Sequence, residues 1–282
     1  MSSNNKSWKQ NFFDECFKVG ISKKEFINCI KYKNQKLDCL YQYTKVKHAK
    51  GLICDKLMFL REIKDLNDPF EGDLLYDVDE LYKIRVKYNN NINLTKKQVK
   101  IDADEGIELM KRAIFISCFS EENNITPMWG HYADNHKCIC LKYDFNKCEK
   151  LKHTCFPISY IHEERNMEIF PKIYLENENY EEWHKAKLLL EAFSNKSPEW
   201  EYEKEWRIII PKGLSFNDIM TFSNNDKNYI NFLKPSSVFL GYRIKKSDAD
   251  YIKDLCDLEE IEVYKMKKDT TSYNLTCELY EG

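Results

Sequence analysis

The sequence lacks the short signatures that mark several large enzyme classes. It contains no Walker-A glycines, no G-x-G-x-x-G, no G-x-S-x-G and no H-E-x-x-H, which argues against P-loop NTPases, Rossmann dehydrogenases, serine hydrolases and zincins. No apolar run of about eighteen residues is present, so no membrane-spanning helix is expected. Residues 1–13, MSSNNKSWKQNFF, have no basic region followed by an apolar core. The sequence therefore predicts a cytoplasmic protein without a signal peptide.

Neither sign of charge dominates, and the cysteines lack the spacing of metal sites. Lys and Arg number 44 against 46 Asp and Glu, so no net positive field favours sequence-independent nucleic-acid binding. The 11 cysteines are odd in number and include no C-x-x-C pair, which predicts reduced thiols and no zinc site. A chain of 282 residues with 43% apolar content can bury the core of one large domain.

What the sequence does contain is helical periodicity mixed with short alternating runs. Residues 1–36 have aromatic side chains at helical spacing and a Ser22–Glu25 capping box, which predicts a helical hairpin whose aromatic surface serves the parent core, a partner or a second copy. Residues 37–282 show no βαβ rhythm, repeat or linker, so we expect a single α+β domain with a mainly antiparallel sheet flanked by helices. Residues 79–112 are expected to form a polar, exposed, helical insertion.

The first segment that concentrates charge is EWEYEKEWRIII, residues 199–210, which alternates strictly. We expect one strand with Glu203, Glu205 and Arg207 on the same face. Carboxylates at i and i+2 repel one another, so at least one pKa is raised unless Arg207 or a cationic ligand compensates them. The alternative is the wet face of an edge strand, although the isoleucines that follow are typical of a central strand.

The second such segment is MWGHYADNH, residues 128–136, which predicts a short helix after Pro127. On a helix the side chains of His131 and His136 diverge, which argues against a His-His metal pair. A loop would instead allow His131, Asp134 and His136 to converge on a metal ion.

The third is NDPFEG, residues 67–72, a turn signal that follows a predicted strand. We expect Asn67 and Asp68 to form the turn, with the Asn67 side chain satisfying its backbone. Phe70 is then predicted to anchor the loop to the core and to hold Glu71 at the rim of a cleft.

These segments and others resemble, in the same order, a bacterial family called domain of unknown function twenty-nine seventy-one. The resemblance covers about residues 37–265 and is carried by LYQY, LNDPFEG, CFSEENN, MWGHYADNHKCICLKYD, NKSPEWEYEKEWRI and VFLGY. The name of that family implies no activity.

An early aromatic strand, a middle strand ending in serine and a late Glu-x-Glu are also similar to the ADP-ribosyltransferase superfamily. This resemblance implies NAD in a cleft of a split antiparallel sheet. It implies that Glu205 holds the nicotinamide ribose and stabilises an oxocarbenium-like cation, and that Glu203 activates an acceptor. The residues expected around NAD are Tyr43, Ser120, Trp129, His131, Tyr132, His136 and Arg207. Tyr43 departs from the arginine or histidine usual at its position.

We therefore expect an NAD-consuming enzyme, either an ADP-ribosyltransferase with a protein or nucleic-acid acceptor or an NAD glycohydrolase, serving as a toxin or phage-defence effector without a metal. A non-catalytic module that binds a nucleotide or a protein is the alternative. A third interpretation is a metal-dependent hydrolase or nuclease that uses Glu203, Glu205, His131 and Asp134.

Overall fold

The chain is an α+β protein, as its sequence predicts. A computed structural model describes residues 7–89, 94–162, 167, 169, 171, 182–211 and 229–282. The described α-helices are α1 (Trp8–Cys16), α2 (Lys23–Lys36), α3 (Ala49–Ile53), α4 (Val78–Asn89), α5 (Lys96–Arg112), α6 (Thr126–His131), α7 (Glu149–Thr154), α10 (Glu182–Phe193) and α11 (Lys246–Leu258). Short 3-10 turns are η1 (Val46–His48), η2 (Ile63–Asp65), η3 (Phe145–Lys147) and η4 (Pro198–Glu203). None of the described helices is long and apolar enough to cross a membrane.

The main sheet has the strand order β13-β12-β11-β5-β1-β4-β9-β6, with β3 beside β4. Only β11 and β12 are parallel among these neighbours. Its strands are β1 (Cys39–Thr44), β3 (Arg61–Glu62), β4 (Ile114–Ser120), β5 (Ile139–Asp144), β6 (Cys155–Pro157), β9 (Glu205–Pro211), β11 (Ser237–Leu240), β12 (Glu262–Lys268) and β13 (Leu275–Leu279). Two small sheets pair β2 (Leu57–Phe59) with β10 (Tyr229–Asn231), and β7 (Ser159–Tyr160) with β8 (Asn195–Lys196).

The main sheet opens between β1 and β4. These strands share a single register pair, Tyr41 opposite Ser120. Beyond it β1 stays paired with β5, and β4 stays paired with β9 along its whole length. Farther along β4, the edge that faces β1 pairs with β3 instead, at Ile116 and Phe115. Residues 42–44 and 117–119 therefore border a gap in the sheet.

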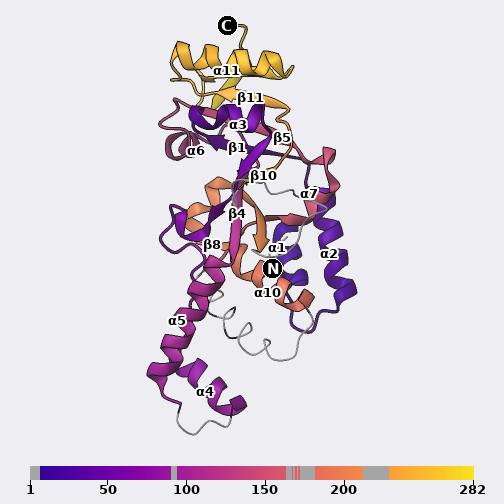
Figure 1. The fold of residues 1–282 in the computed structure, drawn as a ribbon, viewed down its shortest axis with the longest axis vertical. Coiled ribbons are helices and arrows are strands. Elements are labelled where there is room, and N and C mark those ends of the chain that lie inside the picture. Colours follow the sequence, from indigo (N-terminus) through magenta and orange to yellow (C-terminus); the bar gives the residue numbers. More distant parts are fainter. Residues whose placement is uncertain are drawn as a thin grey trace.

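Helices cover both halves of the opened sheet. In Figure 1, α3, α6 and α11 lie around β1, β5 and β11 at one end of the molecule, and α1, α2 and α10 lie around the other half. The main core joins α3 and α11 to alternate residues of β5, β9 and β11, because successive side chains of a strand point to opposite faces. A separate cluster packs α6 against the other face of β5 and β11.

The N-terminal hairpin uses its aromatic side chains inside the chain. The Ser22–Glu25 capping box is present at the start of α2, and a second box joins Ser7 to Gln10 at the start of α1. Phe12 and Phe13 are buried in a cluster that includes Phe156 of β6. The aromatic surface of residues 7–36 is thus packed against the parent core.

The predicted insertion consists of α4 and α5, which extend away from the sheet (Figure 1). The Thr95 hydroxyl caps α5 by accepting a hydrogen bond from the Gln98 N–H (3.2 Å). One side of α5 buries Val99, Ala103 and Ile107, so this helix is amphipathic and only partly exposed. Residues 90–93 of the predicted insertion lie outside the described residues.

Candidate functional site

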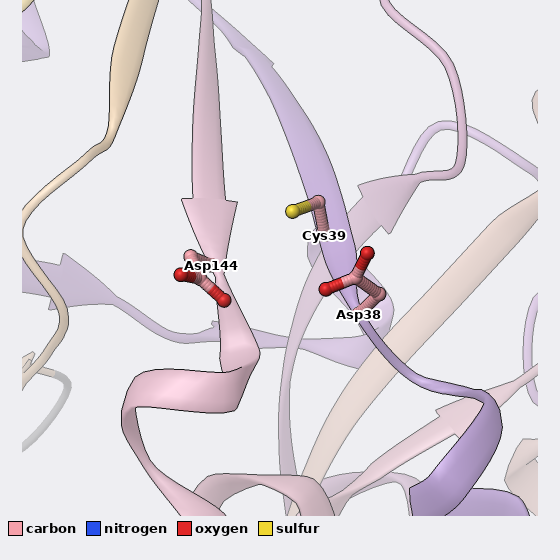
Figure 2. A group of neighbouring side chains, drawn as sticks. All are labelled: Asp38, Cys39 and Asp144. Atoms are coloured by element: carbon pink, nitrogen blue, oxygen red, sulfur yellow. The ribbon is translucent and has the colours of Figure 1, made fainter.

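Potential metal ligands gather at one place in the described residues, and it differs from both sets that the alternative metal-site interpretations named. Asp38, Cys39 and Asp144 lie together at the ends of β1 and β5 (Figure 2). Their carboxylates already accept hydrogen bonds from Asn146, one of them from its backbone N–H to Asp144 (3.0 Å). His131, Asp134 and His136 do not form such a group. The four residues of the hydrolase interpretation, Glu203, Glu205, His131 and Asp134, do not form one either.

A cavity of about 270 Å³ lies where β1 and β4 separate. Its walls include residues 41–44 of β1, residues 116–120 of β4, the η1–α3 segment and the β2–β3 segment. Glu71, Lys196, Glu203 and Glu205 also border it. The volume is close to the lower end of ligand pockets, so the cavity has room for a small ligand or for one part of a larger one.

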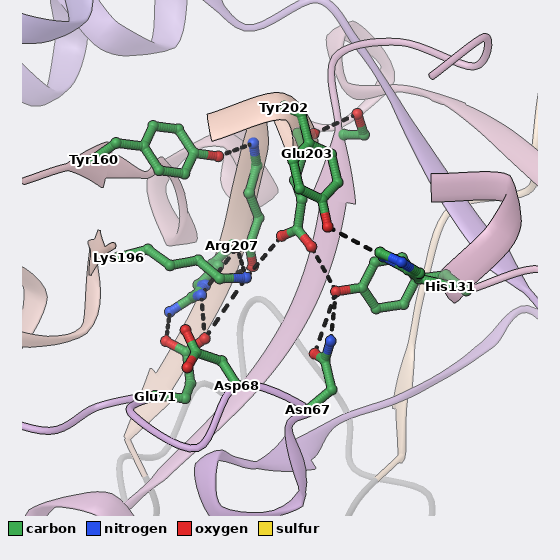
Figure 3. Close-up of polar contacts among 12 residues, drawn as sticks. Asn67, Asp68, Glu71, His131, Tyr160, Lys196, Tyr202, Glu203 and Arg207 are labelled. Atoms are coloured by element: carbon green, nitrogen blue, oxygen red, sulfur yellow. Dashed lines mark hydrogen bonds and ion pairs between the residues drawn. The ribbon is translucent and has the colours of Figure 1, made fainter. Parts of the chain in front are cut away.

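The buried centre of the site is Arg207, which is clamped between two carboxylates (Figure 3). Its guanidinium donates to both oxygens of Glu71 (2.6 and 2.9 Å) and to both oxygens of Glu205 (2.6 and 2.9 Å). It also donates to the Phe193 carbonyl (3.2 Å). Paired, charge-assisted hydrogen bonds of this kind fix both distance and orientation.

A second buried cation, Lys196, connects the three carboxylates. Its Nζ lies 2.7 Å from Glu203, 3.1 Å from Glu205 and 3.8 Å from Glu71. It also lies 4.7 Å from the centre of the Trp200 ring. Three carboxylates against two cations leave one excess negative charge, which a proton or a cationic ligand would neutralise.

A polar chain leads from Glu203 to the surface. The Tyr132 hydroxyl donates to Glu203 Oε1 (2.5 Å), and the Asn67 amide donates to that hydroxyl (3.0 Å). Next to Glu203, the Tyr202 hydroxyl lies 3.1 Å from His131 Nδ1. Glu203 is thus held from one side by Lys196 and from the other by Tyr132.

The strand predicted over residues 199–210 is shorter than expected. The prediction that Glu203 lies on the same strand as Glu205 and Arg207 is therefore wrong. Pro198 begins the η4 turn, Lys204 has a left-handed backbone (φ 48°), and β9 starts only at Glu205. Proline fixes its own φ and favours the first position of such a turn. Within β9 the alternation holds: Glu205 and Arg207 share one face, while Trp206 joins the main core on the other.

Neighbouring strands hold this turn so that Glu203 and Glu205 still converge. The Ser120 hydroxyl donates to the Glu203 carbonyl (2.7 Å) and accepts from the Glu122 N–H (3.3 Å). The Glu205 N–H donates to the Tyr160 hydroxyl (2.8 Å). Glu203 from the η4 turn and Glu205 from β9 therefore border the same cavity.

The environment drives the pKa values of these two carboxyls apart. Burial and the negative charge of Glu205 raise the pKa of the Glu203 carboxyl. Burial acts to raise the pKa of Glu205 as well, but the charges of Arg207 and Lys196 outweigh it and lower that pKa to about 2. Burial and the charge of Glu203 raise the pKa of Tyr132, so its hydroxyl keeps its proton and donates. Glu205 stays ionised, while Glu203 exchanges a proton more readily.

The turn chemistry of NDPFEG differs from the prediction in the roles of its first two residues. Asp68, not Asn67, satisfies the turn: its side chain is buried and accepts from the Phe70 N–H (2.9 Å). The Asn67 side chain bonds the Tyr132 hydroxyl instead. Asp and Asn both cap turns, so the sequence alone does not decide between them.

The last part of the loop is inverted relative to the prediction. Phe70 is 70% exposed and anchors nothing, whereas Glu71 is only 6% exposed and binds Arg207 inside the protein. A buried carboxylate is favoured here because a buried guanidinium compensates it. Glu71 therefore borders the cavity, but as part of the buried ionic network and not at an exposed rim.

Gly72 allows the loop to close, and we predict that Gly72→Ala destabilises the protein by about 1–3 kcal/mol. Its φ is +68°, and an added Cβ would lie 2.8 Å from Ile63 Cγ2 and 3.1 Å from Phe193 Cε1. Urea unfolding would measure the loss. The matched control is Gly51→Ala in α3, where a Cβ would meet nothing within 4 Å and helix propensity favours alanine. Equal stability of the two variants would contradict the prediction.

Several predicted ligand contacts are used by the protein itself. Tyr43 borders the cavity, but its hydroxyl donates to the Glu122 carbonyl (2.9 Å). Trp129 is fully buried and its indole donates to the Asn123 carbonyl (2.7 Å), so the structure places it in the core rather than against a ligand.

The two histidines also lie apart from the cavity wall. His131 is exposed and bonds the hydroxyl of Tyr202, the residue that precedes Glu203. His136 follows α6 with a left-handed backbone (φ 67°) and packs 4.9 Å from the Tyr242 ring. Neither residue borders the cavity. The predicted site residues that border the cavity are Tyr43, Asn67, Glu71, Ser120, Tyr132, Glu203 and Glu205.

Sequence reasoning missed Lys196 and Tyr160. Lys196 lies seven residues before Glu203 in NKSPEWEYE, where nothing distinguishes it from a surface lysine. Tyr160 lies 45 residues before Glu205 in the chain, and it comes close because it follows β6, which pairs with β9. An unbalanced row of glutamates was the available signal, because buried carboxylates require nearby cations.

The fold and this site define an α+β protein with an opened sheet and a buried ionic network beside a cavity. Residues 128–208 match the model of the family described as Protein of unknown function (DUF2971), which confirms the resemblance found in the ordered motifs. The matched range contains Tyr132, Lys196, Glu203, Glu205 and Arg207. Searches of curated proteins and of solved structures gave no match.

Proposed function

We propose that the chain cleaves the N-glycosidic bond of NAD in the cavity between β1 and β4. The observation that carries this proposal is the pair of buried carboxylates, Glu203 and Glu205, whose pKa values shift in opposite directions. Opposite shifts in neighbouring acids are typical of sites where one group stays charged and the other moves a proton.

The excess negative charge of the network suits this substrate. The nicotinamide ring of NAD is a cation, and cleavage of its glycosidic bond transfers positive charge to the ribose. In the proposal the bond between ribose C1′ and the ring nitrogen breaks, and its electron pair leaves with neutral nicotinamide. The ionised Glu205, held by Arg207 and Lys196, stabilises the resulting oxocarbenium ion through its fixed charge.

Glu203 completes the reaction as the general base. Water or an acceptor hydroxyl attacks C1′, and its proton passes to the Glu203 carboxylate. Lys196 and Tyr132 hold that carboxylate at the cavity wall, and Asn67 orients Tyr132. Attack by water makes the chain a glycohydrolase, and attack by a protein or nucleic acid makes it a transferase. Either activity suits a cytoplasmic toxin or phage-defence effector that depletes NAD or marks a target.

We expect nicotinamide release when the purified chain is incubated with NAD. The measurement follows nicotinamide and any ADP-ribose mark, with and without cell lysate, because a mark identifies the acceptor. NAD should also raise the melting temperature, as any ligand of the folded state does. A higher melting temperature without nicotinamide release would support the alternative, a non-catalytic nucleotide-binding module. The absence of both effects would contradict the proposal.

A further inference from the structure

Positive charge gathers on a different part of the same cavity wall. Lys47 and His48 come from η1, and Arg61 is the first residue of β3. All three are exposed, whereas Glu71, Glu203 and Glu205 are buried. The cavity is thus basic at its open side and acidic at its floor.

The two exposed cations of this group, Lys47 and Arg61, have no carboxylate partner within the chain segments that the structure describes. Nearby lysines do: Lys64 lies 2.7 Å from Glu62, and Lys56 lies 3.9 Å from Glu259. Among the described residues, Lys47 and Arg61 form no such ion pair. Burial, followed by the charges of Lys47, Arg61 and Lys45, lowers the pKa of His48. Like charges held around one imidazole repel one another unless an anion joins them.

The backbone directs Arg61 toward the cavity for a local reason. Residues 57–62 are extended, and Leu60 is fully buried, so Phe59 and Arg61 share the opposite side of the chain. Both border the cavity, and the Phe59 ring packs 5.1 Å from Tyr229. Gly51 lies on the same wall, and nothing occupies the 4 Å around its missing Cβ. The basic side of the cavity therefore has free space beside it.

We infer that this basic wall, formed by Lys47, His48 and Arg61, binds the diphosphate of the substrate. Arginine and lysine donors match phosphate oxygens, and arginine contacts them in pairs. A diphosphate at the open side would leave the attached ribose to extend toward Glu203. The identity of the substrate rests on the proposed function, but the binding of diphosphate does not.

The direct test is calorimetric binding of inorganic pyrophosphate to the full chain at low salt. We expect Lys47→Gln/Arg61→Gln to weaken binding about tenfold or more, which corresponds to a loss of about 1.4 kcal/mol or more of binding free energy, because charge-assisted hydrogen bonds to the anion are lost. The matched control is Lys50→Gln, which removes an exposed lysine of α3 that does not border the cavity. Equal affinity of the double variant and the native chain, or no binding by the native chain, would overturn the inference.

A kinetic test separates this inference from the proposed function. The double variant should raise KM for NAD while leaving kcat unchanged, and it should leave KM for nicotinamide riboside, which lacks phosphate, unchanged. Equal effects on both substrates would overturn the diphosphate site. Pyrophosphate binding that depends on Arg61, together with no turnover of either substrate, would refute the proposed function and support the diphosphate site.

Discussion

Glu203→Gln is expected to lower kcat for nicotinamide release by about 10²- to 10⁴-fold, the usual range for removal of a general base. Glutamine keeps the shape of the side chain, and its carbonyl oxygen accepts from Lys196 while its NH2 group donates to the Tyr132 hydroxyl, but it cannot take a proton at neutral pH. Release would be followed at saturating NAD, where kcat reports the bound complex. Turnover equal to that of the native chain would remove Glu203 from the mechanism.

The fold should survive this substitution. The three carboxylates outnumber Lys196 and Arg207 by one charge, and glutamine removes that excess. Because burial already raises the pKa of Glu203, the folded state holds its charged form at a cost, and the neutral amide avoids it. Denaturant unfolding should therefore show no loss of stability. The matched control, Glu201→Gln, alters an exposed glutamate of the same η4 turn and should leave both kcat and stability unchanged.

Glu205 is a poorer position for this test. Both of its oxygens accept from Arg207, and one lies 3.1 Å from Lys196. Glu205→Gln would deprive two buried cations of a counter-charge, so lost activity would be inseparable from altered structure.

Arg207→Met is expected to lower the free energy of unfolding by about 3–5 kcal/mol, the cost of removing one partner of a buried ion pair. Arg207 is 1% exposed and bonds both Glu71 and Glu205. Methionine fills similar volume but leaves the three buried carboxylates with Lys196 as their only cation in the network. Urea unfolding of native and variant chains measures the difference, and a loss below about 1 kcal/mol would contradict this account of the network.

A second variant identifies the cause of that loss. Glu71→Gln/Arg207→Met removes one stranded carboxylate together with the arginine, so it should recover part of the lost stability. Additive losses in the double variant would show that packing, rather than unpaired charge, sets the cost. Arg243→Met, at an exposed position, is the matched control and should stay within about 0.5 kcal/mol of the native chain.

Local patterns predicted the elements of the fold well because they depend on nearby residues. The Ser22–Glu25 capping box and the middle strand that ends at Ser120 occur where the sequence placed them. The helix at Pro127 is also present, but it ends at His131 and not at His136. The family resemblance was likewise readable from ordered motifs. Alternation failed before Glu205, because Pro198 and the left-handed Lys204 create a turn that a two-residue period does not register.

The sequence by itself determined the N-terminal helical hairpin, the helical insertion and the presence of a glutamate cluster that requires compensation. Only the tertiary structure decided what compensates it. Arg207 lies two residues after Glu205 in the chain, but the other partners come from other segments: Glu71 bonds Arg207, and Lys196 lies beside Glu205. Phe70 is exposed and Glu71 is buried, which is the reverse of the prediction. Local propensity does not encode such contacts, since the free energy of a buried charge depends on partners that are distant in sequence and close in space.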